Sequence, residues 1–165
     1  MEAFNTRGIL ARVPLFAESL DSRQLDYLAT QCKPVVYPNG AVVMAEGDFG
    51  DAMYVIVDGT VRVTFQDRHG GEQRVAQLGA GDVVGEMSLL TGMRRTATAT
   101  TKGEVAALEI GKVTFEEMFA RRPELIDRFS AVLAGRQAEL DRIAAGADAS
   151  AEAIGARIRR FFGRL

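Results

Sequence analysis

Apolar positions divide the chain into helical ends and a strand-like middle. In residues 1–34 the apolar side chains recur at spacings of three and four, which favour helices. Asp21 or Ser22 can cap one of these helices. Pro34 ends the pattern, because proline disfavours helical geometry at the residue before it. We therefore expect helices over residues 1–34.

From residue 35 to residue 111 the periodicity changes to two. Val61 and Val63 share one face of a short run, and Arg62 and Thr64 share the other. Glycine-rich turns separate such runs at roughly even intervals. Many short strands with this spacing are typical of a sandwich or barrel.

The helical pattern returns in residues 112–145. A short helix is expected over residues 113–121, and a second begins at Pro123, which suits the first turn of a helix. Residues 146–165 form a linker and a basic amphipathic tail. Such a tail can lie on an anionic membrane or dock in a partner's groove, and folding back on its own domain is an equally good alternative.

Composition excludes several classes of protein. With 47% hydrophobic and 25% charged residues, the 165-residue chain is typical of a globular domain rather than a disordered one. No run of about 20 apolar residues could span a bilayer, and no signal pattern points to export, so a cytoplasmic location is expected. Cys32 and His69 are the only residues of their type, which excludes a disulfide framework and multi-histidine metal sites. We expect no metal.

Residues 81–98 carry the candidate chemistry. An apolar strand end meets Gly85, a helix-compatible segment follows over residues 86–91, and two arginines precede the next strand. A helix start offers free N–H groups and a positive dipole end, which favour a bound anion. Arginine binds phosphate with two hydrogen bonds. Glu86, beside this anion site, suits a sugar hydroxyl.

The same segment matches a known motif. Gly85-Glu86, a short helix and Arg95-Thr96-Ala97 follow the pattern Gly-Glu, helix, Arg-Ser/Thr-Ala. This resembles the phosphate-binding cassette of cyclic nucleotide-binding domains, as in the catabolite activator protein, kinase regulatory subunits and cyclic-nucleotide-gated channels. Matches outside the cassette extend the resemblance over roughly residues 8–145.

The resemblance implies a fold and a domain organisation. The fold class is α+β, mainly β: a jelly-roll-like β-roll with N-terminal helices and C-terminal hinge and lid helices. The helical bundle would cover residues 1–34, and the β-roll residues 35–111, with the cassette at 81–98. The hinge and lid helices would cover residues 112–145, before the tail at 146–165.

The resemblance also implies roles for the site residues. Arg95 would pair with the cyclic phosphate, and Glu86 would bind the ribose 2′-hydroxyl. Arg94 would face solvent, because strand alternation sends only one of two adjacent arginines inward. The lid helix would close over the base with Leu133 or Arg136. The other implied contacts are the phosphate cradle and the walls around the base: Gly85, Met87, Ser88, Thr96, Ala97, Val75 and Val83.

Structural alternatives compete with some of these roles. Arg95 and Glu86 could form an ion pair at the mouth of the barrel. A surface pair contributes only about 0–1 kcal/mol, however, and would not explain the whole motif. Ser88 and Thr96 could act as a cap and a strand residue, and Arg136 could lie on a solvated helix face.

The sequence therefore predicts a regulatory sensor for a 3′,5′-cyclic purine nucleotide, with cyclic AMP favoured over cyclic GMP. No enzyme activity is expected, since no acid–base or nucleophile motif is present, and no cofactor besides the ligand. By the resemblance, ligand shifts an equilibrium in which the helix from Pro123 closes over the base.

The expected effector is an ion channel, with this domain on the cytoplasmic side of the inner membrane, by analogy with channels whose chains end in such a domain. Oligomer formation is compatible with this expectation. DNA binding is not expected, because only about twenty residues follow the long helix, too few for a recognition domain. Two alternatives remain: an interaction module of the same fold that no longer binds nucleotide, and a cupin-like enzyme, which usually needs several histidines.

Overall fold

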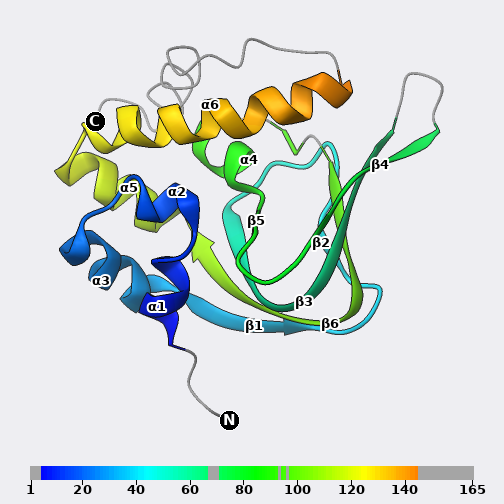
Figure 1. Ribbon diagram of the computed structural model, residues 1–165, viewed down its shortest axis with the longest axis horizontal. Coiled ribbons are helices and arrows are strands. Elements are labelled where there is room, and N and C mark those ends of the chain that lie inside the picture. Colours follow the sequence, from blue (N-terminus) through cyan, green and yellow to red (C-terminus); the bar gives the residue numbers. More distant parts are fainter. Residues whose placement is uncertain (1–4, 67–70, 93, 96, 145–165) are drawn as a thin grey trace.

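Helices lie along one side of a curved antiparallel sheet, with both long strands of the sheet running beneath them (Figure 1). The computed structural model describes residues 5–66, 71–92, 94–95 and 97–144. The order helices, strands, helices agrees with the order that the sequence predicts. In these residues, no helix is both long enough and apolar enough to cross a membrane.

Three short helices open the described chain: α1 (Thr6–Leu10), α2 (Pro14–Ala17) and α3 (Ser22–Gln31). Asp21 is the cap of α3, because its Oδ1 accepts from the backbone N of Gln24 at 2.9 Å. The Gln24 side chain returns the bond by accepting from the backbone N of Asp21 at 2.8 Å, which completes a capping box. The helix ends at Gln31, and the first strand begins at Lys33, one residue before Pro34.

The sheet is organised around two long strands, β3 (Ala52–Gln66) and β6 (Thr98–Gly111). They pair antiparallel, with register shifts around Asp58. Such bulges bend a strand and increase its twist, which curves the sheet into a roll. The shorter strands pair with these two in the order β1-β6-β3-β4, with β2 on β6 and β5 on β3. They are β1 (Lys33–Tyr37), β2 (Val42–Met44), β4 (Glu72–Leu78) and β5 (Val83–Val84).

Alternate side chains of the roll enter two separate apolar clusters. The roll cluster lies inside the roll, and the helix cluster lies between the roll and the helices. Val84 belongs to the roll cluster and its neighbour Val83 to the helix cluster, as expected for successive residues of a strand. The roll cluster contains Ile56, Val61, Val63, Val84, Ala97, Ala99 and Val105.

Phenylalanine rings anchor the last two helices, α5 (Lys112–Arg121) and α6 (Leu125–Ala144). Phe129 on α6 meets Phe119 and Phe115 edge-on, with ring centroids 5.4 and 5.9 Å apart. Phe16 from α2 completes the group, 6.4 Å from Phe129. Edge-to-face pairs of this kind add specific stabilisation to apolar burial. They hold α6 across α2 and α4 (Glu86–Thr91), as Figure 1 shows.

Candidate functional site

The cassette folds as a strand, a glycine and one short helix, as its sequence predicts. Gly85 follows β5 with a left-handed φ of 86° and is the N-cap of α4. Gly92 ends the helix with a φ of 73°. Residues with side chains rarely adopt such φ values, so the two glycines fix where this helix begins and ends. All six residues of α4 are buried.

Arg95 lies under the beginning of α4, with 6% of its surface exposed. Its Nη1 donates to the carbonyl of Gly85 at 3.1 Å, and its Nη2 donates to the carbonyl of Ala52 at 2.9 Å. The backbone of Arg95 pairs with the loop before β3: its N donates to the Asp48 carbonyl at 2.6 Å, and its carbonyl accepts from Gly47 N at 2.7 Å. Backbone and side chain thus both fix the guanidinium at the cassette.

Acidic groups surround this buried cation. Burial lowers the pKa of the Arg95 guanidinium from its ordinary value, while Tyr54, Asp51, Glu86 and Asp48 act in the opposite direction. An arginine remains protonated at neutral pH even so. These groups stabilise the buried cation, and they also limit how much negative charge a ligand beside Arg95 can carry.

Arg94 lies at the surface, whereas Arg95 is buried. It is exposed, with its Cζ 4.6 Å from the ring centroid of Phe49, and its Nη1 donates to the Gly47 carbonyl at 3.2 Å. The expectation that only one of the two arginines points inward is confirmed.

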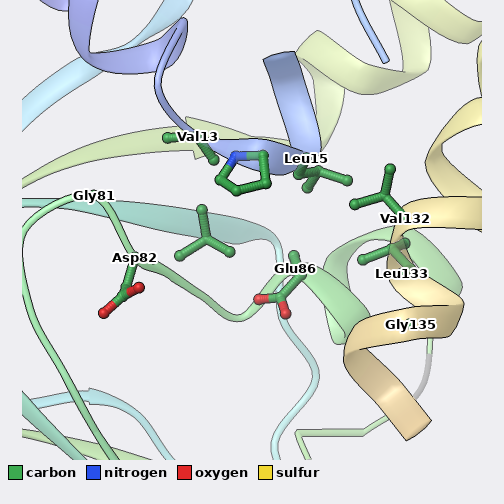
Figure 2. Close-up of a pocket in the computed structure, with 10 residues that line it drawn as sticks. Val13, Leu15, Gly81, Asp82, Glu86, Val132, Leu133 and Gly135 are labelled. Carbon is green, nitrogen blue, oxygen red and sulfur yellow. The ribbon is translucent and has the colours of Figure 1, made fainter. Parts of the chain in front are cut away.

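A cavity of about 300 Å³ lies beside the cassette, between α2, β5 and α6 (Figure 2). Three predicted site residues share its lining: Val83, Glu86 and Leu133. Figure 2 shows Leu133 reaching from α6 on the side where Glu86 begins α4. Arg95 is not among the lining residues. The complete lining comprises Val13, Pro14, Leu15, Gly81, Asp82, Val83, Glu86, Val132, Leu133 and Gly135.

The other predicted site residues lie in different surroundings. Gly85 and Arg95 meet directly through a hydrogen bond. Met87 and Ser88 are buried within α4, and Ala97 enters the roll cluster. Thr96 lies outside the described residues, and so do the side chains of Val75 on β4 and Arg136 on α6.

Several contacts of the site had no signal in the sequence. Ala52 supplies a carbonyl to Arg95, and Gly50 lies against the guanidinium. Leu15 and its neighbours Val13 and Pro14 also line the cavity, although they precede Glu86 by about seventy residues in the sequence. These approaches join distant segments, whereas the sequence pattern reports neighbours on one strand or helix face.

Comparison with known proteins finds relatives that are described as activated or gated by cyclic nucleotides. A transcriptional regulator of Mycobacterium tuberculosis, described as CRP-like and cAMP-activated, is 34% identical over 128 residues, which are 78% of this chain and 57% of the relative. A cyclic nucleotide-gated potassium channel of Rhizobium etli is 35% identical over 119 residues, which are 72% of this chain and 32% of the channel. The chain therefore spans about half the length of the first relative and a third of the second.

The fold agrees with these relatives. The crystal structure of the catabolite activator protein of Thermus thermophilus superimposes with a TM-score of 0.67 at 31% identity, over 78% of this chain and 60% of that protein. The predicted β-roll fold is confirmed. The family model described as "Cyclic nucleotide-binding domain" matches residues 34–122, and this chain belongs to the cyclic nucleotide-binding domain family.

Proposed function

We propose that this chain is a regulatory sensor domain that binds a 3′,5′-cyclic purine nucleotide, with cyclic AMP preferred. One observation carries the proposal: the buried cation of Arg95 is held by the carbonyl of Gly85, at the start of a buried helix. An arginine at this place can bind a phosphate with two parallel hydrogen bonds. The mycobacterial relative is described as cAMP-activated, which supports cyclic AMP as the ligand.

The remaining contacts would follow from the same geometry. Glu86, with 4% of its surface exposed, would accept a hydrogen bond from the ribose 2′-hydroxyl. Leu133 on α6 would cover the base once the helix closes. Ligand would shift α6 toward the closed arrangement only by binding that arrangement more tightly than the open one.

The effector of such a sensor remains a prediction. The relatives include a transcriptional regulator and a potassium channel, and they share this domain rather than one output. The expectations of an ion-channel effector, no DNA contact, no enzyme activity and a cytoplasmic location therefore stay predictions. The interaction module that no longer binds nucleotide is the competing function.

Calorimetric titration with cyclic AMP and cyclic GMP tests the proposal. The wild type should bind one nucleotide per chain, Arg95→Ala should lose that binding, and Arg94→Ala should keep it, because Arg94 is exposed. Ligand at about 100 times its dissociation constant should raise the free energy of unfolding by roughly 2.7 kcal/mol. If the wild type gives neither heat nor stabilisation with either nucleotide, the sensor function is wrong and the interaction module replaces it.

A further inference from the structure

Arg95 occupies a slot whose walls are two glycines. A Cβ on Gly85 would lie 2.2 Å from Nη1 of Arg95. A Cβ on Gly50 would lie 2.3 Å from Cζ, 2.5 Å from Nη2 and 2.6 Å from Nε. Since the central carbon of the guanidinium is the nearest of these three atoms, the missing side chain of Gly50 leaves room for the guanidinium itself.

The two glycines differ in what else requires them. Gly85 has a left-handed φ of 86°, so its backbone conformation alone favours glycine. Gly50 has no left-handed φ, so its φ does not by itself require glycine. The close approach of the Arg95 guanidinium therefore explains why position 50 is a glycine.

The backbone cannot easily relieve a collision at this place. Arg95 is bonded on both sides to the loop that carries Gly50, through Asp48 and Gly47. Carbon atoms pack at about 3.5–4.0 Å, so a methyl group on Gly50 would move the guanidinium by about 1 Å or more. The hydrogen bonds to Gly85 and Ala52, at 3.1 and 2.9 Å, would not both survive such a move.

We infer that Gly50 is a positioning residue: by lacking a side chain, it holds the Arg95 guanidinium at the start of α4, where the anion would bind. The ligand part of this inference rests on the proposed function, and the positioning part does not. Because the atoms that must move are at the end of a flexible side chain, Gly50→Ala displaces the charge and leaves the fold in place.

The first test needs no ligand. We expect Gly50→Ala to lower Tm when Arg95 is present and to have no effect in an Arg95→Ala background, where nothing is left to collide. Gly79→Ala is the matched control, since Gly79 also lacks a left-handed φ and its nearest neighbour is a carbonyl at 3.9 Å. The NMR signal of the Arg95 Nε–H, identified by its loss in Arg95→Ala, should move in Gly50→Ala and stay in Gly79→Ala. An equal fall of Tm in both backgrounds, or an unmoved signal, overturns the positioning role.

The second test measures cyclic AMP affinity. Gly50→Ala should weaken binding about tenfold to a hundredfold, the loss expected for a misplaced charged hydrogen bond, while Gly79→Ala should bind like the wild type. If the wild type binds and Gly50→Ala binds equally well, the inference is wrong. If the wild type does not bind, the proposed function fails, and the Tm and NMR comparison still decides whether Gly50 positions Arg95.

Discussion

The hydroxyl of Tyr27 on α3 donates a hydrogen bond to the carboxylate of Glu117 on α5. Arg121, one turn further along α5, places its Cζ 5.8 Å from the centroid of the Tyr27 ring. The hydrogen bond is the largest cause that raises the pKa of Tyr27 above its ordinary value of 10.0, followed by burial. Tyr27 thereby joins the N-terminal helices to the helix that precedes α6.

We expect Tyr27→Phe to lower the free energy of unfolding by up to about 1 kcal/mol at pH 7, because it removes the hydrogen bond and keeps the ring. A raised pKa in the folded state stabilises the protein below the unfolded value of 10.0, and that stabilisation is lost as the pH rises through the folded value. Urea unfolding of both proteins should therefore show a difference that shrinks above pH 10. A difference that stays constant across this range would contradict the assignment.

Cys32 should react slowly with thiol reagents in the folded protein. Burial raises the pKa of its thiol to about 12, and its Sγ donates to the carbonyl of Leu28 at 3.3 Å. The thiolate is the reactive form, so the folded protein at pH 8 should react on the order of a thousandfold more slowly than the protein in urea. Colorimetric labelling in both conditions measures the ratio, and equal rates would show that the thiol is accessible and ionised.

Replacing Phe129 should destabilise the protein more than replacing any exposed phenylalanine. Its ring is fully buried against three others, from Phe16, Phe115 and Phe119. Phe129→Ala should cost about 3–5 kcal/mol of unfolding free energy, the usual cost of a cavity left by an aromatic ring. Phe49→Ala is the matched control, since Phe49 is 70% exposed and its contact with Arg94 is worth no more than about 1 kcal/mol. Equal costs in denaturant titrations would mean that α6 is not anchored by these rings.

Features that depend on near neighbours were predictable from the sequence. The helix between Gly85 and Gly92, the cap at Asp21 and the opposite directions of Arg94 and Arg95 follow from spacing and from local hydrogen bonding. The motif of the family located the cassette, and the structure places Gly85 and Arg95 in contact there.

Features that depend on tertiary approach were not predictable. The bulges around Asp58 shift the register of β3 against β6, and a one-residue shift exchanges the faces of every later side chain. The slot at Gly50 and the cavity beside Glu86 each join segments that are far apart in the chain. Val83 lines that cavity from the helix cluster, and its contact with the base stays a prediction.

The charges around Arg95 should favour a singly charged phosphate. One guanidinium lies among the carboxylates of Asp48, Asp51 and Glu86, so a second negative charge on the ligand is repelled. A cyclic phosphate carries one charge at all ordinary pH values, while a phosphate monoester such as 5′-AMP gains its second charge at about pH 6. The affinity for 5′-AMP should therefore fall between pH 5 and pH 7.5, and that for cyclic AMP should not.

Asp51→Asn identifies the source of this repulsion. The variant removes one of the carboxylates beside Arg95, so the pH-dependent loss of 5′-AMP affinity should become smaller. Competition against a fluorescent cyclic nucleotide measures both ligands in one assay. A parallel loss of affinity for both ligands with rising pH would show that a group on the protein titrates. The site would then not discriminate between singly and doubly charged phosphates.

Glu86 should accept a hydrogen bond from the ribose 2′-hydroxyl. Its buried carboxylate lies at the start of α4, and a hydrogen bond to a charged acceptor contributes more than one to a neutral group. The wild type should bind 2′-deoxy cyclic AMP about tenfold to a hundredfold more weakly than cyclic AMP, and Glu86→Gln should reduce that ratio. Asp82→Asn is the control, because Asp82 also lines the cavity but is exposed and accepts from Gly79 N. Glu86 would not be the ribose ligand if Glu86→Gln and Asp82→Asn both kept the wild-type ratio.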